Sequence, residues 1–544
     1  MKIPRLVGWL FFAACSCVFW GATPRSAWGY AIQIHNEVTR RALSHSGFAV
    51  PAAPINPQAM AELRDFLAEQ GRTNPAIASA WQTRYPTAAA FDAFAQKQLL
   101  LLAAGSQVFG IDRVDERLAS GQTLLDVLSW GAGQPDEDWR NRERLAYDDK
   151  RQPLKDKFGQ PVPADPALLN MGKLGGLSSQ AHAHYGLAQV EFSGDSDVLD
   201  TDPRRFARAV GWEKGPIMTL AAEMTQIHLD LALLAGLSDA PTSQELGWQF
   251  TGEGFHYLSD IGNQIHTVQV GFFGFFKDAF LERAKLGLWT FGGYLGTMRS
   301  LGSIGIDILS SHHTLSEELT YRRFKAALEG KGSPETVRLL KAPEEDDPEF
   351  AKKLDEALAK LGEHPERGEF GLVITRTLID VSSHEGDDVY RATANIADPA
   401  LRTRFKLFHE DRDDPEQFVI PRNDKTETAY VEFFSLQERA FRRVGTAMRR
   451  FVKLQQALLA SAKTPEEKLA LRKEIAGRLL ARQLKALSDT ESRLAQYLSD
   501  PPQSVNAPEH SLLFLAVDVF FIVGFGGLCV FLLSRKRKSA QSAA

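Results

Sequence analysis

Three residues in the middle of the chain have the types and the spacing of a metal site. His256 and Asp260 are four residues apart, so on a helix their side chains point the same way and can share one ion. His266 follows ten residues after His256, and an unbroken helix would turn it about 80° away. Gly262 and Asn263 form a candidate break that would bring it back. Imidazole nitrogens and carboxylate oxygens are ligands that suit zinc.

Other histidines and acidic residues provide further candidate ligands. His313 and Glu317 repeat the four-residue helical spacing, although that pair alone also fits a solvated helix start. His182 and His184 lie so close together that only one of them need face a metal. His384, beside several acidic residues, is a candidate ligand or substrate contact outside these groups.

A glycine- and acid-rich stretch, residues 131–138, follows an apolar segment. Its composition predicts a loop, and more specifically an acidic turn after a helix. Asp136 and Asp138 are the carboxylates that this turn could offer to a metal, and both remain open on spacing alone.

Charge and cysteine content argue against two features, a global electrostatic attraction to anionic partners and a disulfide-stabilised body. The net charge is −5, so no global electrostatic field would recruit nucleic acid or an anionic membrane. Cys15, Cys17 and Cys529 are the only cysteines, and they lie in the two terminal apolar segments. No disulfide can therefore hold the body of the protein together.

The two ends of the chain predict export and a membrane anchor. Residues 1–27 have the order of basic, apolar and small residues of a secretory signal, and cleavage after them would make Trp28 the N-terminus. Residues 511–533 are apolar and long enough to span a bilayer as a helix. The basic tail, 534–544, then places the C-terminus in the cytoplasm. We expect a single-pass protein of the bacterial inner membrane, with its body in the periplasm or outside the cell.

Between the ends, apolar residues recur at helical spacing, which predicts an all-α fold. The clearest helical segments are 57–69, 89–104, 216–234, 350–361 and 429–460. From residue 426 to 499 the composition shifts to strong helix formers. We expect a helical hairpin or stalk over residues 401–506 that carries a catalytic domain, residues 28–400, above the membrane.

The triplet of His256, Asp260 and His266 resembles the His-x3-Asp-x5-His core of the zinc-dependent phospholipases C and the related single-strand-specific nucleases. Enzymes of this superfamily are all-α and hold three zinc ions. Their mature N-terminal tryptophan is itself a ligand, and Trp28-Gly29 followed by His35 is similar to that start. The acidic turn, a histidine and a last His-x3-acid pair then follow in the chain order of the family.

The resemblance implies three zinc ions per chain and a ligand set. The implied ligands are Trp28, His35, Asp136, His184, His256, Asp260, His266, His313 and Glu317. Within it, Asp136 is preferred to Asp138 because it directly follows the glycine-proline turn. His184 is preferred to His182 because the following tyrosine is similar to the family's His-aromatic pair.

The implied chemistry is hydrolysis of a phosphoric ester. An open zinc site keeps water bound for attack and stabilises charge that develops on phosphorus. Asp136, His256 and Asp260 are the expected catalytic residues. The distances along the chain from Asp136 to His184 and from His266 to His313 exceed those of the family, which predicts insertions at about 139–181 and 268–310.

The second insertion favours a lipid substrate. It interleaves glycines with aromatic residues beside the predicted site, as in a membrane-dipping lid or an acyl-facing wall, although an ordinary buried helical hairpin has the same pattern. We therefore expect a phospholipase C acting at a phospholipid membrane, with no nucleic-acid partner.

Two alternatives remain. The first is a single-strand nuclease or 3′-nucleotidase, because aromatic side chains also stack bases. The second is a non-catalytic, zinc-stabilised scaffold tethered to the membrane. The absence of cysteine from the body disfavours this second alternative, because structural zinc sites are often cysteine-rich.

Overall fold

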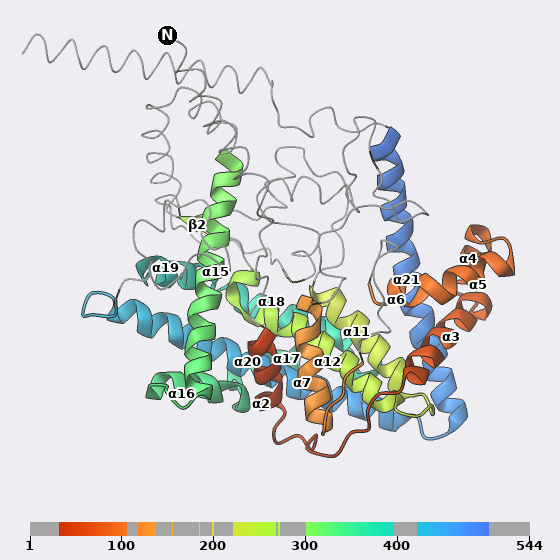
Figure 1. The fold of residues 1–544 in the computed structure, drawn as a ribbon, viewed down its shortest axis with the longest axis horizontal. Coiled ribbons are helices and arrows are strands. Elements are labelled where there is room, and N and C mark those ends of the chain that lie inside the picture. The colour runs from red at the N-terminus through yellow and green to blue at the C-terminus, as the bar shows by residue number, and fades with distance from the viewer. Residues whose placement is uncertain are drawn as a thin grey trace, which may run out of the picture.

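The structure, a computed structural model, describes ten parts of the chain. They are residues 32–105, 118–137, 155, 184, 186, 198–200, 221–267, 270–272, 301–396 and 421–499. These parts are predominantly helical, which confirms the predicted all-α class (Figure 1). Among them the exception is one short antiparallel pair, β1 (Val198–Asp200) and β2 (Val270–Phe272).

The helices follow one another in chain order. They are α2 (Ile32–Ala42), α3 (Pro57–Thr73), α4 (Ala78–Arg84), α5 (Ala88–Phe94), η1 (Ala95–Leu99), α6 (Leu100–Ala103), α7 (Leu124–Glu137), α11 (Ala221–Gly236), α12 (Ser243–Gly262), η5 (Gln264–His266), α15 (Leu301–Leu328), α16 (Pro334–Lys341), η6 (Ala342–Glu344), α17 (Pro348–Ala359), η7 (Pro365–Arg367), α18 (Phe370–Ser383), α19 (Gly386–Ile396), α20 (Glu427–Ser461) and α21 (Pro465–Ser499).

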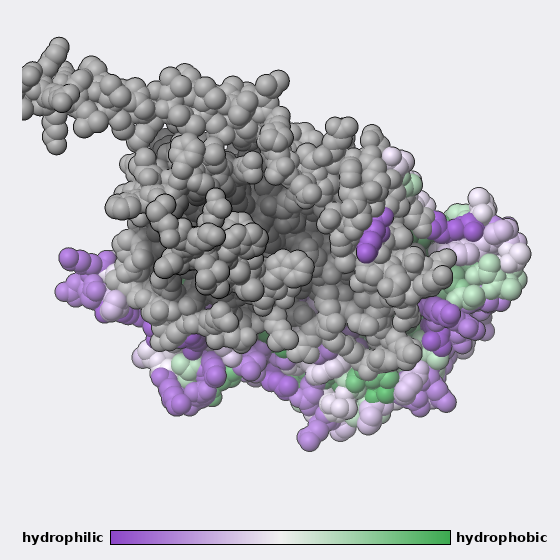
Figure 2. Space-filling model, turned by 45° about the horizontal axis from the view of Figure 1, so that its top comes forward, coloured by the Kyte–Doolittle hydropathy of each residue, from purple (hydrophilic) through white to green (hydrophobic). Residues whose placement is uncertain are grey.

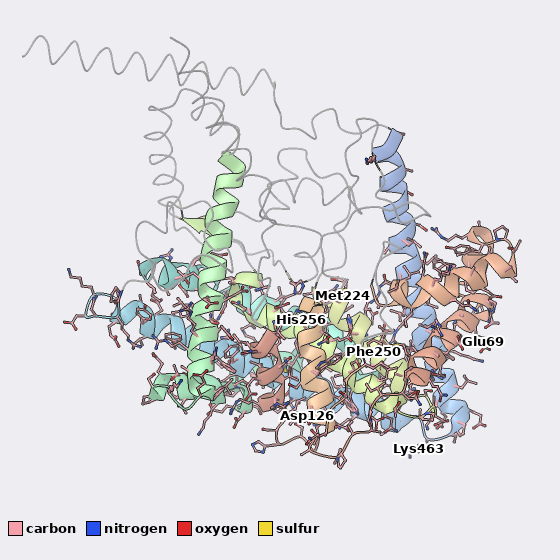
Figure 3. The ribbon with its side chains drawn as sticks, in the orientation of Figure 1. Glu69, Asp126, Met224, Phe250, His256 and Lys463 are labelled. Carbon is pink, nitrogen blue, oxygen red and sulfur yellow. The ribbon has the colours of Figure 1, made fainter. Side chains whose placement is uncertain are left out.

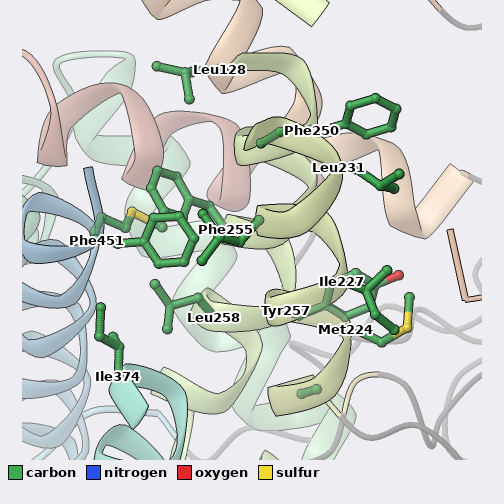
Figure 4. Packing of buried hydrophobic residues seen from close by; sticks show 14 of the residues in the cluster. Leu128, Met224, Ile227, Leu231, Phe250, Phe255, Tyr257, Leu258, Ile374 and Phe451 are labelled. Atoms are coloured by element: carbon green, nitrogen blue, oxygen red, sulfur yellow. The ribbon is translucent and has the colours of Figure 1, made fainter. Parts of the chain in front are cut away.

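Helix α12 is the centre of the body. It packs along α11 and α7, and it also contacts α18, α20 and α2. Its apolar side chains are fully buried on several faces, which is the pattern of a core helix and not of a surface helix. Phe255 of α12 meets Phe451 of α20 edge to face, with 5.2 Å between ring centroids, and Leu258 lies in the same cluster (Figure 4).

Glycines allow α7 and α12 to pack with their backbones in contact. A Cβ atom on Gly252 would lie 2.2 Å from the carbonyl oxygen of Leu128, and one on Gly131 would lie 2.5 Å from the carbonyl oxygen of Gln249. Only glycine fits at either position, because real Cβ atoms do not approach backbone oxygens so closely. This packing places the C-terminal half of α7 against the middle of α12.

The loop predicted at residues 131–138 is wrong for residues 131–137, which are the last turns of α7. Gly131 and Gly133 serve helix packing here and do not make a turn, since a Cβ on Gly133 would lie 2.6 Å from Asn36 Oδ1 of α2. Pro135 lies inside the helix, where it supplies no amide to the carbonyl four residues earlier.

The predicted break after Asp260 is confirmed. Helix α12 ends at Gly262, and Asn263 is extended with ψ 118°. The chain then makes the single 3₁₀ turn η5, which ends at His266. Gly262 also permits a close contact, because a Cβ there would lie 2.0 Å from Val444 Cγ2 of α20.

The two long C-terminal helices are part of the same core as the rest of the body. Helix α20 packs on α18, α19, α2 and α12, and α21 packs on α11, α3 and α6. In Figure 1, α20 runs across the lower part of the molecule and α21 rises at one side. Within residues 421–499, both helices therefore bury apolar faces against the other described helices.

The predicted membrane segments cannot be compared with the structure, because 1–27, 511–533 and the tail after them lie outside the described residues, as does most of both insertions. No helix in the described part of the chain is both long and apolar enough to cross a bilayer. On the face drawn in Figure 2, the coloured, solvent-facing residues are mostly hydrophilic, with only small hydrophobic areas between them.

Candidate metal centre

Six of the nine predicted ligands lie together in the interior of the body. They are His35 of α2, His184, His256 and Asp260 of α12, His266 of η5 and Glu317 of α15. Five of these side chains are at most 1% exposed, and Glu317 is 4% exposed. Figure 3 shows His256 inside the helical body, with Asp126 at the far, N-terminal end of α7. Six polar or ionisable groups in such a position require partners, because burying an unpaired charge is costly.

Asp260 is the hub of the first half of the cluster. Its Oδ2 lies 2.6 Å from His184 Nδ1 and 3.3 Å from His256 Nε2, and its Oδ1 lies 3.5 Å from His35 Nε2. His184 Nδ1 is also 3.1 Å from His256 Nε2. One ligand atom each from His35, His256 and Asp260 lie within 4.8 Å of one another, and this group could hold a metal ion.

His266 and Glu317 form the second half. His266 Nε2 lies 3.0 Å from Glu317 Oε1. On its other side, His266 Nδ1 donates to the carbonyl oxygen of His184 at 3.2 Å, and the amide of Gly186 donates to the carbonyl oxygen of His266 at 3.0 Å. His184 and Gly186 therefore connect the two halves, His184 through both its side chain and its carbonyl and Gly186 through its amide.

Hydrogen bonds at Nδ1 fix which ring nitrogen of three histidines carries the proton. His256 Nδ1 donates to the carbonyl oxygen of Ala132 at 2.8 Å, and His266 Nδ1 donates to that of His184. His35 Nδ1 is 2.6 Å from Ser259 Oγ, whose hydroxyl hydrogen is used on the carbonyl of His256. His35 is therefore the donor in that contact. A neutral imidazole has one N–H, so Nε2 is an acceptor in all three rings.

The Nε2 acceptors point at carboxyl oxygens. His35 Nε2 faces Asp260 Oδ1, which belongs to an ionised carboxylate and is itself an acceptor. His266 Nε2 faces Glu317 Oε1, which donates while that carboxyl is protonated and is an acceptor once it is ionised. Two lone pairs repel unless a proton or a cation lies between them. Histidines that donate Nδ1–H to a carbonyl or hydroxyl and present Nε2 to a shared point are arranged as metal ligands are. This is the feature that sets the cluster apart from a satisfied core network.

Within the described residues, His184 Nε2 and Asp260 Oδ1 have no hydrogen-bond partner, and both side chains are fully buried. A buried polar atom in this state loses the free energy of its hydration without compensation. Coordination of a cation by the cluster would supply that compensation, so the residues present fit a bound metal.

Burial sets the protonation states. It lowers the pKa of His35 and of His184, so both rings are neutral at pH 7, as metal ligands must be. Burial alone would raise the pKa of Asp260, but His256 and His184 outweigh it and hold that pKa well below its usual range. Glu317 is different, because burial raises its pKa to about 8 in the absence of a cation.

The raised pKa of Glu317 gives a pH dependence that can be measured on metal-free protein. The folded state keeps this carboxyl protonated above the unfolded pKa of 4.5. Its contribution to stability is therefore complete below about pH 4.5 and is lost as the pH rises to about 8. After chelation of all metal, the free energy of unfolding of the wild type should fall relative to that of Glu317→Gln as the pH rises over this range. A pKa shift of this size corresponds to a fall of a few kcal/mol. Urea unfolding across the pH range measures the difference.

Added zinc should reverse this pH dependence. Zinc binds the ionised carboxylate, so binding below pH 8 should release the Glu317 proton, and calorimetry in buffers of different ionisation enthalpy would count it. If the free energy of unfolding of the metal-free wild type and of Glu317→Gln changed with pH in the same way, the pH dependence could not be assigned to Glu317.

Three predicted ligands are only partly placed or not placed. Trp28 lies outside the described residues. For Asp136 and His313 the structure describes only the backbone: Asp136 lies one turn beyond Ala132 on α7, and His313 lies one turn before Glu317 on α15. Of the two pairs of alternatives, His184 is in the cluster, whereas His182 and Asp138 lie outside the described residues.

Sequence reasoning missed the residues that orient the ligands. Ser259 follows His256 by three residues, so its place on the same helix face was a signal that could have been used. The carbonyl of Ala132 carried no such signal, because its contact with His256 depends on how α7 and α12 pack. His228 is a buried histidine outside the cluster: its Nδ1 donates to the carbonyl of Met224 at 2.8 Å, and its Nε2 lies 3.2 Å from Glu253 Oε2. His384, which follows the last residue of α18, is exposed and bonds to the carbonyl of Asp380 in that helix.

Comparison of the chain with models of protein families, with curated proteins and with solved structures found no match.

Proposed function

We propose that this protein is a zinc-dependent phosphoric ester hydrolase. The observation that carries the proposal is the convergence of acceptor atoms from His35, His256 and Asp260, all buried, with the other ring nitrogens tied to hydrogen-bond acceptors. The imidazole rings are thus oriented as the rings of metal-binding histidines are. The resemblance of the triplet to the zinc phospholipase C and single-strand nuclease superfamily independently suggests the same residues.

Zinc is the metal that the ligand types favour. The cluster offers four imidazoles and two carboxylates and no thiolate, a set that suits zinc better than calcium or magnesium. Three ions per chain is the number that the resemblance suggests, with Asp136, His313 and Trp28 as the further ligands. Zinc in such a site activates water and stabilises charge on a phosphoryl group.

With metal bound, the pocket would be cationic, because the surrounding residues neutralise only part of the metal charge. Histidine binds a metal in its neutral form, so only the carboxylates offset the metal charge. Asp260 and Glu317, both ionised as ligands, contribute two negative charges between them. With Asp136 the total would be three against the six positive charges of three zinc ions. The remaining positive charge favours an anionic phosphodiester. Ser259 holds the ring of His35 in place, and the Ala132 carbonyl holds the ring of His256.

Phospholipid is the substrate that we propose, so the reaction would be that of a phospholipase C, giving diacylglycerol and a phosphorylated head group. The support is the predicted membrane anchor at 511–533 and the aromatic insertion at 268–310. A protein tethered in the bacterial inner membrane with its body in the periplasm or outside the cell meets phospholipid continuously. The alternative function is that of a single-strand nuclease or 3′-nucleotidase, which would use the same metal cluster.

The substrate is tested by offering both classes to one preparation. The full-length chain, exported in a bacterial host and purified in detergent with zinc, would be assayed on phosphatidylcholine mixed micelles and on single-stranded DNA. We expect diacylglycerol release from the lipid and no cleavage of DNA. His256→Ala should lose the activity, whereas His228→Gln, which alters a buried histidine outside the cluster, should keep it.

The other outcomes decide between the alternatives. Nucleotide release without lipid hydrolysis would move the protein to the nuclease branch. A preparation that retains zinc but cleaves neither substrate would support the non-catalytic scaffold.

A further inference from the structure

Helix α20, which the sequence places in a separate stalk, contacts the turn that carries His266. At Gly262, where α12 ends, a Cβ atom would lie 2.0 Å from Val444 Cγ2 of α20. Two residues later, Gln264 of η5 is fully buried, and its side-chain amide donates to the carbonyl oxygen of Leu436 on α20 at 3.1 Å. The direction that the chain takes after α12 is thus fixed against α20.

The same amide is the end of a partly buried ionic network. Gln264 Nε2 also donates to Glu385 Oε2 at 3.1 Å. Arg443 of α20 holds that carboxylate with two parallel hydrogen bonds of 2.8 and 2.9 Å, and Arg439 adds a third at 3.1 Å. Bidentate arginine–carboxylate pairs fix geometry as well as charge. Each oxygen of Glu385 therefore accepts two hydrogen bonds, and its direction is fully determined.

The network is also anchored at its far end. Arg443 Nε donates to Asp347 Oδ2 at 3.2 Å, and the other oxygen of Asp347 caps the N-terminus of α17 by accepting from the amide of Phe350 at 2.9 Å. A rigid helix start thus holds Arg443. A continuous path of hydrogen bonds leads from α17 through α20 and Glu385 to η5.

We propose that Gln264, Glu385 and Arg443 are positioning residues for the metal ligand His266. His266 lies two residues after Gln264 in the same 3₁₀ turn, and its ring must present Nε2 toward Glu317 while Nδ1 reaches the carbonyl of His184. A single turn has too few internal hydrogen bonds to hold that orientation. The side chain of Gln264, tied to Glu385 and to α20, supplies the missing restraint. This inference rests on the proposed metal site.

The test compares zinc affinity in the full-length protein and two variants. Gln264→Met removes the amide at nearly constant volume, and Glu385→Gln removes the charge that Arg443 holds. We expect each variant to bind one zinc ion 10- to 100-fold more weakly in a chelator competition, as for other outer-shell partners of metal ligands. We also expect an altered visible spectrum of the cobalt-substituted protein, which a general loss of stability would not produce.

The chain offers a matched control. Arg472 holds Glu62 with the same bidentate geometry, at 2.9 and 3.0 Å, between α21 and α3. Arg472 is 9% exposed and Arg443 is 10% exposed, so the two pairs are similarly buried at the arginine. Glu62→Gln should lower the melting temperature and leave zinc affinity and the cobalt spectrum unchanged.

The outcomes separate this inference from the proposed function. If wild type binds zinc, and Gln264→Met and Glu385→Gln bind it with wild-type affinity and give the wild-type cobalt spectrum, the positioning role is overturned and the metal site stands. If wild type itself takes up no zinc, the proposed function and this inference fail together.

Discussion

Asp260→Asn is expected to abolish hydrolysis while leaving the fold intact. Asp260 is the one residue whose two carboxylate oxygens face His35, His184 and His256. Asparagine has nearly the same shape but brings an N–H donor and no charge to the point where the acceptors converge. The loss of a metal ligand removes several kcal/mol of transition-state stabilisation, so kcat/KM should fall by roughly 10³-fold or more.

The measurement is zinc content together with the initial rate on the substrate that the wild type cleaves. We expect at least one zinc ion fewer per chain by elemental analysis. The matched control is Asp230→Asn, because Asp230 is equally buried on the neighbouring helix α11 but pairs with Arg478 at 2.8 Å. That variant should lose stability and keep its zinc. An Asp260→Asn protein with wild-type zinc content and rate would remove Asp260 from the site.

Gly252→Ala is expected to lower both stability and metal binding. The added methyl group would lie 2.2 Å from the carbonyl oxygen of Leu128 and 3.1 Å from the amide nitrogen of Ala132. Both are backbone atoms, so α7 and α12 must move apart. Overpacking of this kind costs about 1–3 kcal/mol or more. Separation of the helices also weakens the bond from His256 Nδ1 to the Ala132 carbonyl, so zinc affinity should fall.

The control for this variant lies on the same helix. A Cβ on Gly254 would meet His228 Cβ at 3.3 Å and only the Thr225 carbonyl oxygen beyond it, at 3.5 Å. Gly254→Ala should therefore change the free energy of unfolding little, since better helix propensity offsets the tighter contact. Urea unfolding and zinc competition on the two variants give the comparison. Equal effects of both substitutions would show that the contact between α7 and α12 does not set the geometry of His256.

The sequence alone determined the parts of the site that depend on local geometry. Four-residue spacing on a helix was enough to place His256 beside Asp260, because helical geometry depends little on tertiary context. Gly262 and Asn263 were enough to predict the break that returns His266 to the cluster. The all-α class followed from apolar spacing over long segments in the same way.

The family resemblance named His35, His184 and Glu317 as ligands, but only the tertiary structure shows how these distant residues meet the local group and how they are held. They reach Asp260 and His266 because separate segments pack around α12, and no spacing in the chain encodes those contacts. The stretch after residue 130 was predicted to be a turn because glycine and proline favour turns locally. In the fold, Gly131 lets two helix backbones touch, and the buried area outweighs the local preference. Helix α20 was assigned to a stalk for a similar reason. Composition indicates that a segment is helical, whereas only packing shows that Arg443 bonds to Glu385 and that Val444 contacts Gly262, where α12 ends.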